Sequence, residues 1–420
     1  MNFSRRLFLC TAMMLASLAV SVHADDWPQW LGPNRNGHAG VDAPAVDKLA
    51  PEPKVLWRKR IGGGFSSPVV ADGKLVLFDE NGEEEVAHLL NADTGAEIWK
   101  TAIGAVYRDE WGAGPRSTPI IDGDLVFVQS CKGEFRCLNL TNGVVIWGAS
   151  FEKDFSVKFL GSQANEGTAR RRGNNGSAVV DGDAVIVPVG SSDGATLVCF
   201  DKRNGKMIWK AGSDEAAYSS PVVATLVGVK QVVFFDADAL MGVERAHGSV
   251  LWRVPFITGA KRHAATPVIM GDTVIVNSQT IGLVATKIIR EGDALQAVPL
   301  WANKQLKINL STSVQVGDYL YNQGPGSTYI CADARTGEMK WRAPGFGARD
   351  TANASTIAVG KNLLVLTDEG ELVLIAARAD QYTELSRVQV CGRNWNFPAL
   401  SNGRLYVRDV RELICYQLVP

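Results

Sequence analysis

A nine-residue pattern that ends in tryptophan recurs along this chain and constrains the fold more than any other feature. Its five copies, at residues 91–99, 139–147, 201–209, 244–252 and 333–341, each place a Gly four residues before the Trp. A Gly at that point supplies the positive φ angle that a tight hairpin turn needs. The Trp begins a short strand, and one hairpin cannot bury so large a ring alone. Repeated copies therefore predict neighbouring modules that cover one another.

Eight modules of this kind follow one another, with a period a little over forty residues. Each is expected to hold a strand around a Ser/Thr-Pro step, two further apolar strands and the hairpin that leads to the Trp. The fifth module lacks the turn Gly, and an insertion at residues 151–173 lengthens the interval before the fourth Trp position. The predicted Trp-docking positions are Trp57, Trp99, Trp147, Trp209, Trp252, Trp301 and Trp341, with Ser386 at the place where the seventh module has lost its Trp.

The two ends of the repeat region complement each other. Residues 396–418 supply three strands without a Trp, and residues 53–58 supply a lone outer strand that carries Trp57. Joined, they make one complete module, which removes the exposed sheet edges that an open array would leave. The sequence therefore predicts an all-β fold, an eight-bladed β-propeller with four-stranded antiparallel blades, closed by the N- and C-terminal strands. The propeller is expected over residues 53–420, after an N-terminal extension at 25–52.

The first 24 residues have the composition of an export signal. Arg5 and Arg6 precede an apolar run at 7–22, and the sequence up to Ala24 suits cleavage after that residue. The arginine pair is compatible with the Sec route and with the twin-arginine route, and both stay open. Cys10 lacks the preceding small residue of a lipoprotein signal, and no later apolar run is long enough to span a bilayer. We expect an exported protein, periplasmic or secreted, without a membrane span.

Charge and cysteine usage exclude several classes of protein. The formal net charge is −1, which is unlike the basic surface of a nucleic-acid-binding protein. Cys137, Cys199 and Cys331 each lie ten residues before a docking Trp, so they are expected in separate cores as small buried hydrophobes. A disulfide between Cys131 and Cys137 stays possible. No Cys-x-x-Cys-His haem motif and no histidine pair at zinc-site spacing occurs.

The innermost strands of a propeller begin around its central channel, so the residues at their starts are candidates for a binding site. Amide groups, a cation and flat rings in this set suit a polar small molecule or a peptide. The plainer interpretation, that these groups satisfy backbone and hold channel water, also stays open. The residues three before the Pro-type position are Phe65, Arg116, Asn175, Tyr218, Ala264, Leu310, Asn353 and Trp395, and the polar residues one place earlier are Asn174, His263, Asn309 and Asn394.

Two connections add candidates at the rim of this funnel. The insertion ends in Arg170, Arg171 and Arg172, which as a block suit an acidic group or an acidic partner surface. A solvated run of charges is the alternative for the same three residues. Tyr107 and Trp111, in the connection before Arg116, are also expected near the rim.

The repeated Asp-x-x-Thr-Gly-x-x-x-Trp hairpin resembles the tryptophan-docking motif of the pyrroloquinoline-quinone (PQQ) repeat family, over residues 53–418. The opening DWPQWLGPN at 26–34 is similar to the start of exported bacterial members. This family includes quinoprotein dehydrogenases, which bind PQQ and Ca²⁺ in the propeller funnel. It also includes non-catalytic scaffolds such as the lipoprotein of the outer-membrane β-barrel assembly machine. The fold alone therefore does not decide the function.

The dehydrogenase resemblance implies adjacent cysteines over the quinone, acidic Ca²⁺ ligands and an Asp base. No Cys-Cys pair occurs, and Glu83, Glu84 and Glu85 are interpreted as a solvated hairpin loop. We therefore expect a non-catalytic exported binding or scaffold protein without a cofactor. It is expected to bind an unknown ligand or partner at the funnel, and envelope proteins are possible partners. The alternative is a PQQ- and Ca²⁺-dependent alcohol or sugar dehydrogenase. A third possibility is a role in outer-membrane protein assembly by strand addition or loop docking.

Overall fold

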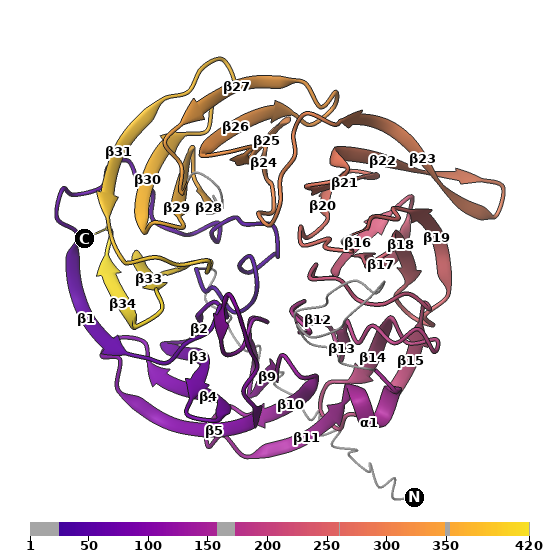
Figure 1. Ribbon diagram of the computed structural model, residues 1–420, viewed down its shortest axis with the longest axis horizontal. Coiled ribbons are helices and arrows are strands. Elements are labelled where there is room, and N and C mark those ends of the chain that lie inside the picture. Colours follow the sequence, from indigo (N-terminus) through magenta and orange to yellow (C-terminus); the bar gives the residue numbers. More distant parts are fainter. Residues whose placement is uncertain (1–24, 158–172, 260, 349–352, 420) are drawn as a thin grey trace, which may run out of the picture.

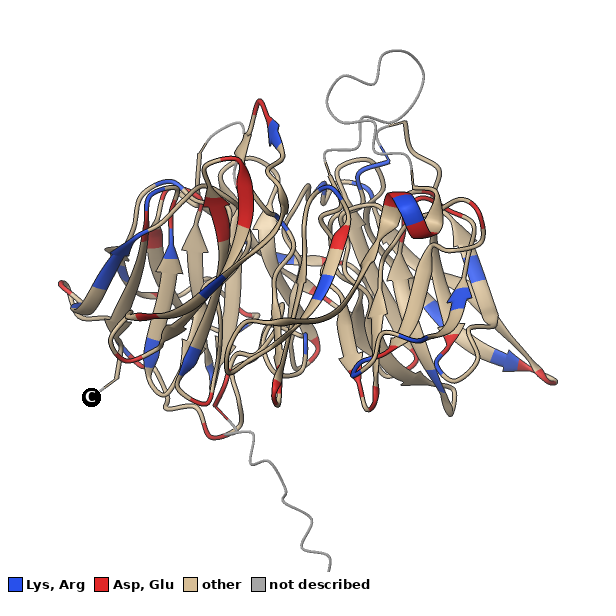
Figure 2. Ribbon diagram, turned by 90° about the horizontal axis from the view of Figure 1, so that it is seen from below, with Lys and Arg blue, Asp and Glu red and all other residues tan. Residues whose placement is uncertain are grey.

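The chain closes into a ring of eight four-stranded antiparallel sheets around a central channel (Figure 1), as predicted. The computed structural model describes residues 25–157, 173–259, 261–348 and 353–419. The expected leader at 1–24 and Arg170, Arg171 and Arg172 lie outside the described residues. Seen from the side, the ring is a short cylinder whose charged residues lie mainly toward its two faces and on the outer strands (Figure 2).

Each blade runs from an inner strand beside the channel to an outer strand. Blade 1 contains β2 (Val69–Ala71), β3 (Lys74–Asn81), β4 (Glu84–Asn91) and β5 (Glu97–Ala105). Blade 2 contains β8 (Ile120–Asp122), β9 (Leu125–Gln129), β10 (Glu134–Asn139) and β11 (Val145–Ser150). Blade 3 contains β12 (Val179–Asp181), β13 (Ala184–Val187), β14 (Leu197–Asp201) and β15 (Met207–Ala211). Blade 4 contains β16 (Val222–Leu226), β17 (Val229–Phe235), β18 (Ala239–Glu244) and β19 (Val250–Pro255).

The second half of the ring repeats this order. Blade 5 contains β20 (Val268–Met270), β21 (Thr273–Ser278), β22 (Gly282–Glu291) and β23 (Ala294–Asn303). Blade 6 contains β24 (Val314–Val316), β25 (Tyr319–Gly324), β26 (Thr328–Asp333) and β27 (Met339–Pro344). Blade 7 contains β28 (Ala354–Val359), β29 (Asn362–Thr367), β30 (Glu371–Ala376) and β31 (Glu384–Gln389). A small hairpin of β6 (Arg108–Asp109) and β7 (Gly112–Ala113) precedes blade 2, and the short helix α1 (Phe151–Phe155) follows it.

Blade 8 is shared by the two ends of the chain, as the sequence predicts. Its strands are β32 (Ala399–Ser401), β33 (Arg404–Arg408), β34 (Glu412–Gln417) and, outermost, β1 (Lys54–Arg60). Strands β1 and β34 pair antiparallel, with Trp57 opposite Cys415. Every sheet of the ring therefore has a neighbour on both sides, and the closure leaves no open end.

Most docking tryptophans join their blade to the next by a hydrogen bond to a backbone carbonyl, and five of them also pack against a turn Gly. The indole nitrogen of Trp99 donates a 2.8 Å hydrogen bond to the Leu140 carbonyl, and a Cβ on Gly143 would come within 2.7 Å of the Trp99 ring. Trp57, Trp147, Trp209, Trp301 and Trp341 donate in the same way to a carbonyl of the following blade. Trp252 instead donates to Gln231 of its own blade, because blade 5 lacks the Gly turn and extends β22 and β23 outward (Figure 1).

The apolar core lies between the blades and continues around the ring. All six cysteines in the described part of the chain are free and buried, so the possible disulfide between Cys131 and Cys137 is absent there. Cys137 pairs with Trp147 across the ladder, and Cys199 and Cys331 hold the same place in their blades. The repeated cysteines therefore fill equivalent core positions, as predicted.

The N-terminal segment at 25–52 crosses the channel instead of lying apart from the ring (Figure 1). Trp27 pairs with Val70 of blade 1 through two 2.9 Å backbone hydrogen bonds, and Ala39 donates to the Ala358 carbonyl of blade 7. We call the face on which this segment pairs the turn face, because the first turn of each blade lies there. The opposite face, where the chain enters each inner strand, is the funnel face. The segment lies across the channel between these two faces.

Candidate functional site

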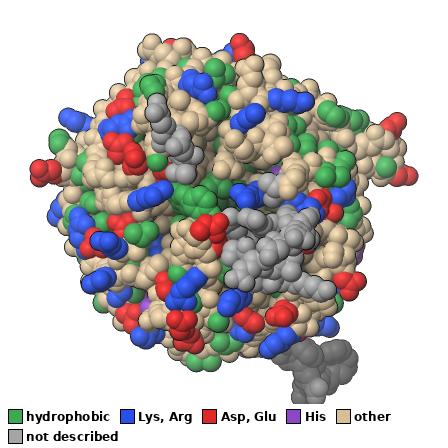
Figure 3. Space-filling view, viewed as in Figure 1, with side chains coloured by type: hydrophobic (Ala, Val, Ile, Leu, Met, Phe, Trp, Pro, Cys, Tyr) green, Lys and Arg blue, Asp and Glu red, His purple; other side chains and the backbone are tan. Residues whose placement is uncertain are grey.

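A cavity of about 380 Å³ opens at the centre of the funnel face. It is lined by all eight residues that the repeat register predicts, together with Asn309 from the second set and the rim candidate Trp111. Figure 3 shows hydrophobic side chains gathered at the centre of one face of the ring. The lining residues are Trp30, Phe65, Trp111, Arg116, Asn175, Ser177, Tyr218, Ser220, Arg262, Ala264, Asn309, Leu310, Asn353, Trp395 and Phe397.

One wall of the cavity is a cluster of three aromatic rings. The ring of Trp395 stacks on Phe65 with centroids 5.6 Å apart, and Trp111 lies 5.1 Å from the same indole. Trp111 reaches this place because the β6–β7 hairpin carries it over the start of blade 2. The buried indole nitrogen of Trp395 has no hydrogen-bond partner within the described residues. The wall therefore offers flat apolar faces to a ligand.

Trp30 forms part of the lining from the N-terminal segment, and the sequence interpretation missed this residue. Its indole nitrogen donates a 2.9 Å hydrogen bond to the Thr266 hydroxyl, and its ring meets Phe397 edge-on with centroids 4.5 Å apart. The segment enters from the turn face, and Trp30 carries it to the lining of the cavity.

The cavity is rich in cations and poor in anions. Arg116 forms a 2.7 Å ion pair with Asp109, whose side chain is fully buried, and the guanidinium also lies over the rings of Phe65 and Tyr107. Arg262 is exposed and forms no ion pair within the described part of the chain. No Asp or Glu is among the described lining residues. The wall therefore favours a ligand with a neutral or anionic polar group.

The blade order places one pair of amides and one pair of aromatic rings on opposite sides of the funnel. Asn175 comes from blade 3 and Asn353 from blade 7, which stand on opposite sides of an eight-bladed ring. Tyr218 and Trp395, from blades 4 and 8, form a second opposed pair. Asn353 accepts a hydrogen bond from the Ser311 hydroxyl, which fixes the orientation of its amide. The funnel thus presents two pairs of recognition groups across one opening.

Three predicted lining residues lie behind the wall instead. Asn174 donates to the Cys131 carbonyl over 3.2 Å, and Asn394 donates to the Thr367 carbonyl over 3.1 Å. His263 is fully buried, stacks on Phe235 at 4.1 Å and hydrogen-bonds the Asp236 carbonyl through Nδ1. Burial lowers the pKa of the His263 imidazole. These side chains tie the funnel connections to the blades and do not reach the cavity.

Glu85 differs from its sequence interpretation as part of a solvated loop. It belongs to β4, its side chain is buried, and its carboxylate accepts backbone N–H groups from Tyr107 at 3.3 Å and Cys131 at 3.0 Å. Burial raises the pKa of Glu85 to about 7. The connection that carries Tyr107 folds over this end of the strand and removes Glu85 from water, which the sequence pattern does not show.

The donor set of the funnel does not fit the Ca²⁺ of a quinoprotein site. Calcium in proteins takes six to eight oxygen ligands, usually with carboxylates among them. Among the described lining residues the side-chain oxygen donors are amides and hydroxyls, and no group of three His, Cys, Asp or Glu occurs in the described ranges. These neutral oxygens would leave the double charge of a calcium ion without a compensating anion.

Within the described ranges, no helix has the length and apolar character required to cross a membrane.

The family model and the curated relatives point to one family. A family model described as outer membrane protein assembly factor BamB matches residues 45–154 and 161–378. The chain is 24% identical over 360 residues to an outer membrane protein assembly factor BamB of Burkholderia pseudomallei, which covers 75% of this chain and 86% of the relative.

Two solved structures resemble the chain in fold. The crystal structure of BamB from Moraxella catarrhalis has a TM-score of 0.58 at 15% identity, covering 87% of this chain and all of that one. A quinohemoprotein alcohol dehydrogenase from Pseudomonas putida has a TM-score of 0.63 at 11% identity, covering 94% of this chain and 80% of that one. At such identities the likeness concerns the fold alone.

Proposed function

This chain belongs to the family described as outer membrane protein assembly factor BamB, and on that basis we propose that it is a non-catalytic binding scaffold of the cell envelope. Its funnel face would hold a ligand or a segment of a partner protein. The single observation that carries this proposal is the aromatic-lined cavity at the centre of the funnel face. Aromatic anchors in a partly enclosed pocket are the usual core of a binding site.

The chemistry of the lining supports binding more than catalysis. Acid–base catalysis needs a group that exchanges protons near neutral pH, most often an imidazole or a carboxyl. Among the described lining residues there is no carboxyl, imidazole or thiol group. The hydroxyls of Ser177 and Ser220 accept backbone N–H groups of the neighbouring blades, at 2.8 and 2.9 Å. They are thus engaged in holding the ring together.

We propose that this scaffold acts outside the cytoplasm. The leader at 1–24, the extension at 25–52 and the propeller at 53–420 form our proposed division of the chain. Envelope proteins are the proposed partners, and Arg170, Arg171 and Arg172 are candidate contacts for an acidic partner surface.

Photo-crosslinking in envelope extracts tests the funnel as the binding face. The chain from Asp25 onward would be compared with Trp395→Ala and Trp111→Ala variants, and with Val144→Ala as a control at an exposed outer position. We expect specific partners to be lost from both funnel variants and kept by the control. Identical partners in all four proteins would refute the proposal. A charge reversal at Arg170 to Arg172 tests the basic block in the same experiment.

The enzyme alternative has its own test. PQQ would be added with Ca²⁺, followed by absorption spectroscopy and by assays of dye-linked alcohol and sugar oxidation. We expect neither a bound quinone spectrum nor turnover. Stoichiometric quinone binding with turnover would replace the scaffold proposal by an oxidoreductase.

A further inference from the structure

On the turn face, the N-terminal segment pairs with one repeated position of the inner strands, two residues after the Pro-type position. In blade 1, Val70 both donates to and accepts from Trp27, and in blade 2 the Ile121 N–H donates to the Pro28 carbonyl. In blade 7, Ala358 donates to the Gly37 carbonyl over 2.8 Å. In blade 6, the Gln315 carbonyl accepts from His38 Nε2 over 2.6 Å. Four blades thus use the same backbone position to hold the segment.

Within the described ranges, blades 3, 4, 5 and 8 carry the same position without such a partner, and blades 4 and 5 line one cavity together with the segment. The equivalent residues are Val223 in β16 and Ile269 in β20, both partly exposed. In an antiparallel ladder, alternate residues direct N–H and C=O away from the paired strand, and Val70 and Ala358 show that this residue faces the channel. Within the described ranges, no backbone hydrogen bond satisfies Val223 or Ile269 on the channel side. Two neighbouring inner strands therefore offer unpaired backbone groups.

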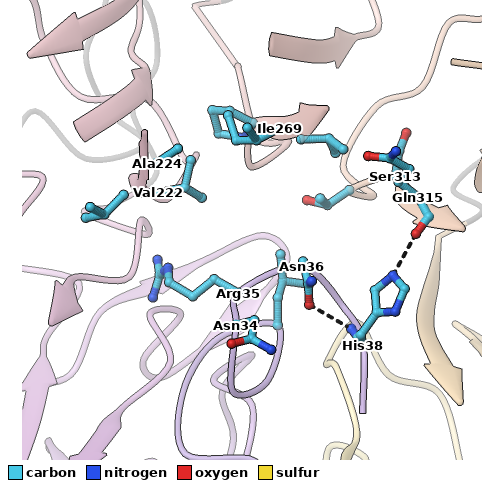
Figure 4. A pocket seen from close by; sticks show the side chains of 14 residues that line it. Asn34, Arg35, Asn36, His38, Val222, Ala224, Ile269, Ser313 and Gln315 are labelled. Carbon is cyan, nitrogen blue, oxygen red and sulfur yellow. Dashed lines mark hydrogen bonds between the residues drawn. The ribbon is translucent and has the colours of Figure 1, made fainter. Parts of the chain in front are cut away.

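These two strands line a cavity of about 370 Å³ between the N-terminal segment and blades 4 to 6. Figure 4 shows Asn34, Arg35, Asn36 and His38 along one side of this cavity. The other side comes from the blades, with Val222, Ala224, Ile269, Ser313 and Gln315 labelled. The cavity therefore has a polar side contributed by the segment and a largely apolar side with strand edges contributed by the ring.

Arg35 brings an uncompensated positive charge to this cavity. Its side chain is buried, and its guanidinium donates to the carbonyls of Ala178 at 2.8 Å and Ser177 at 3.1 Å and to the Gln29 amide oxygen at 3.2 Å. Its Nε has no partner, and no carboxylate pairs with it within the described part of the chain. Burial lowers the pKa of Arg35 to about 9. A buried cation without an anion is unfavourable, so an arriving carboxylate would be stabilised.

We propose that this turn-face cavity binds a short extended peptide, whose backbone pairs with Val223 and Ile269 and whose carboxylate lies against Arg35. The backbone pairing extends to blades 4 and 5 the pattern that the N-terminal segment follows on blades 1, 2, 6 and 7. The side chains of Asn34 and Asn36 line the same cavity and would offer polar contacts to the peptide. This site is separate from the funnel and does not depend on the function proposed for it.

Saturation-transfer NMR and calorimetry with defined tetrapeptides test the site. The probes are acetyl-Val-Ala-Val-Ala with a free carboxylate, its C-terminal amide, acetyl-Val-Ala-Val-Asp amide, a free-acid peptide N-methylated at alternate residues, and sodium acetate. We expect at least one carboxylate peptide to bind about tenfold more tightly than the neutral amide. If the peptide with the free C-terminal carboxylate binds more tightly, the site recognises a chain terminus. If the aspartate peptide binds more tightly, the site recognises an acidic side chain. N-methylation is expected to weaken binding, because it removes the donors that pair with the inner strands.

Protein variants locate the binding. Ala224→Phe fills the cavity and keeps Arg35, whereas Ala302→Phe adds the same ring at an exposed position of β23. We expect Ala224→Phe alone to abolish peptide binding, with the melting temperature of both variants close to that of the wild type. Any of four results would overturn the proposal. The neutral amide or the N-methylated peptide could bind as tightly as the acids, acetate could bind as tightly as the peptides, or Ala224→Phe could still bind the peptide.

Discussion

The indole ring of Trp57, on the strand that closes blade 8, lies directly against Gly95 in the turn of blade 1. A Cβ on Gly95 would stand 2.8 Å from the ring, and Gly95 has a φ angle of +70°. The indole nitrogen of Trp57 donates a 3.0 Å hydrogen bond to the Ala92 carbonyl of the same turn. The closing strand is therefore held from both sides, by β34 within its blade and by the turn of the next blade.

Substitution of Gly95 tests how much this contact contributes to closure. Gly95→Ala should lower the free energy of unfolding in two ways. An alanine at a positive φ angle is strained, and the Trp57 indole must also move, which should cost about 1 to 3 kcal/mol more. The matched control is Gly73→Ala, at a φ angle of +69° with nothing within 4 Å of the added Cβ. Urea unfolding measures both variants. Equal losses would mean that the Trp57 ring adapts freely and does not clamp the ring of blades.

The ion pair between Arg116 and Asp109 should stabilise the funnel rim. Asp109→Asn leaves the largely buried Arg116 without its carboxylate at 2.7 Å, and we expect a loss of about 3 kcal/mol. The control is Asp318→Asn, which breaks an exposed pair with Arg335 and should cost less than about 1 kcal/mol. Chemical denaturation measures both. A loss no larger than that of the control would show that other groups already neutralise Arg116.

Glu85 should make stability depend on pH in the direction opposite to a salt-bridged carboxylate. Its pKa is about 7 in the folded protein against 4.5 for an ordinary glutamate, because burial disfavours the charged form. The folded state therefore binds more protons in this interval, and the free energy of unfolding should fall by up to about 3 kcal/mol as pH rises from 4.5 to above 7. The stabilising contribution is present below pH 4.5 and is lost as pH passes 7.

The pH slope of unfolding in Glu85→Gln, measured between pH 4.5 and 8, isolates this contribution. We expect a flatter profile than that of the wild type, whatever the change in absolute stability. Glu84→Gln, one residue earlier and exposed, should leave the slope unchanged. Parallel profiles for the wild type and Glu85→Gln would show that this carboxyl does not titrate in the interval.

Trp30 should couple the N-terminal segment to the funnel. Trp30→Phe removes the hydrogen bond to the Thr266 hydroxyl and keeps a ring against Phe397, so a loss of about 1 kcal/mol is expected. Trp30→Ala also removes the ring and should cost more, about 3 kcal/mol. Thermal and urea unfolding measure both, with Trp111→Ala as a more exposed aromatic control at the rim of the same cavity. Equal stability of Trp30→Ala and the wild type would mean that Trp30 does not couple the segment to the funnel.

The lining of the funnel could be predicted where it follows the repeat register. Phe65 and Trp395 hold one position in different blades, so the start of each inner strand brings them to the channel. Asn174 and Asn394 stand one residue earlier and lie behind the wall, because adjacent residues of an extended chain point to opposite sides. Asn309 also stands one residue earlier but lines the cavity, so this alternation does not hold in blade 6. The same rule would have found Phe397, which lies two residues after Trp395 and lines the cavity.

The sequence by itself determined the ring, because each turn Gly, each docking Trp and the two incomplete ends act through local backbone geometry and a repeated spacing. Only the tertiary structure decided where residues 25–52 lie and what surrounds Trp30, Arg35 and Glu85. These residues belong to no repeat, and their partners are backbone and side-chain groups of blades far away in sequence. Burial and pairing across such distances depend on the closed ring, so no local pattern records them.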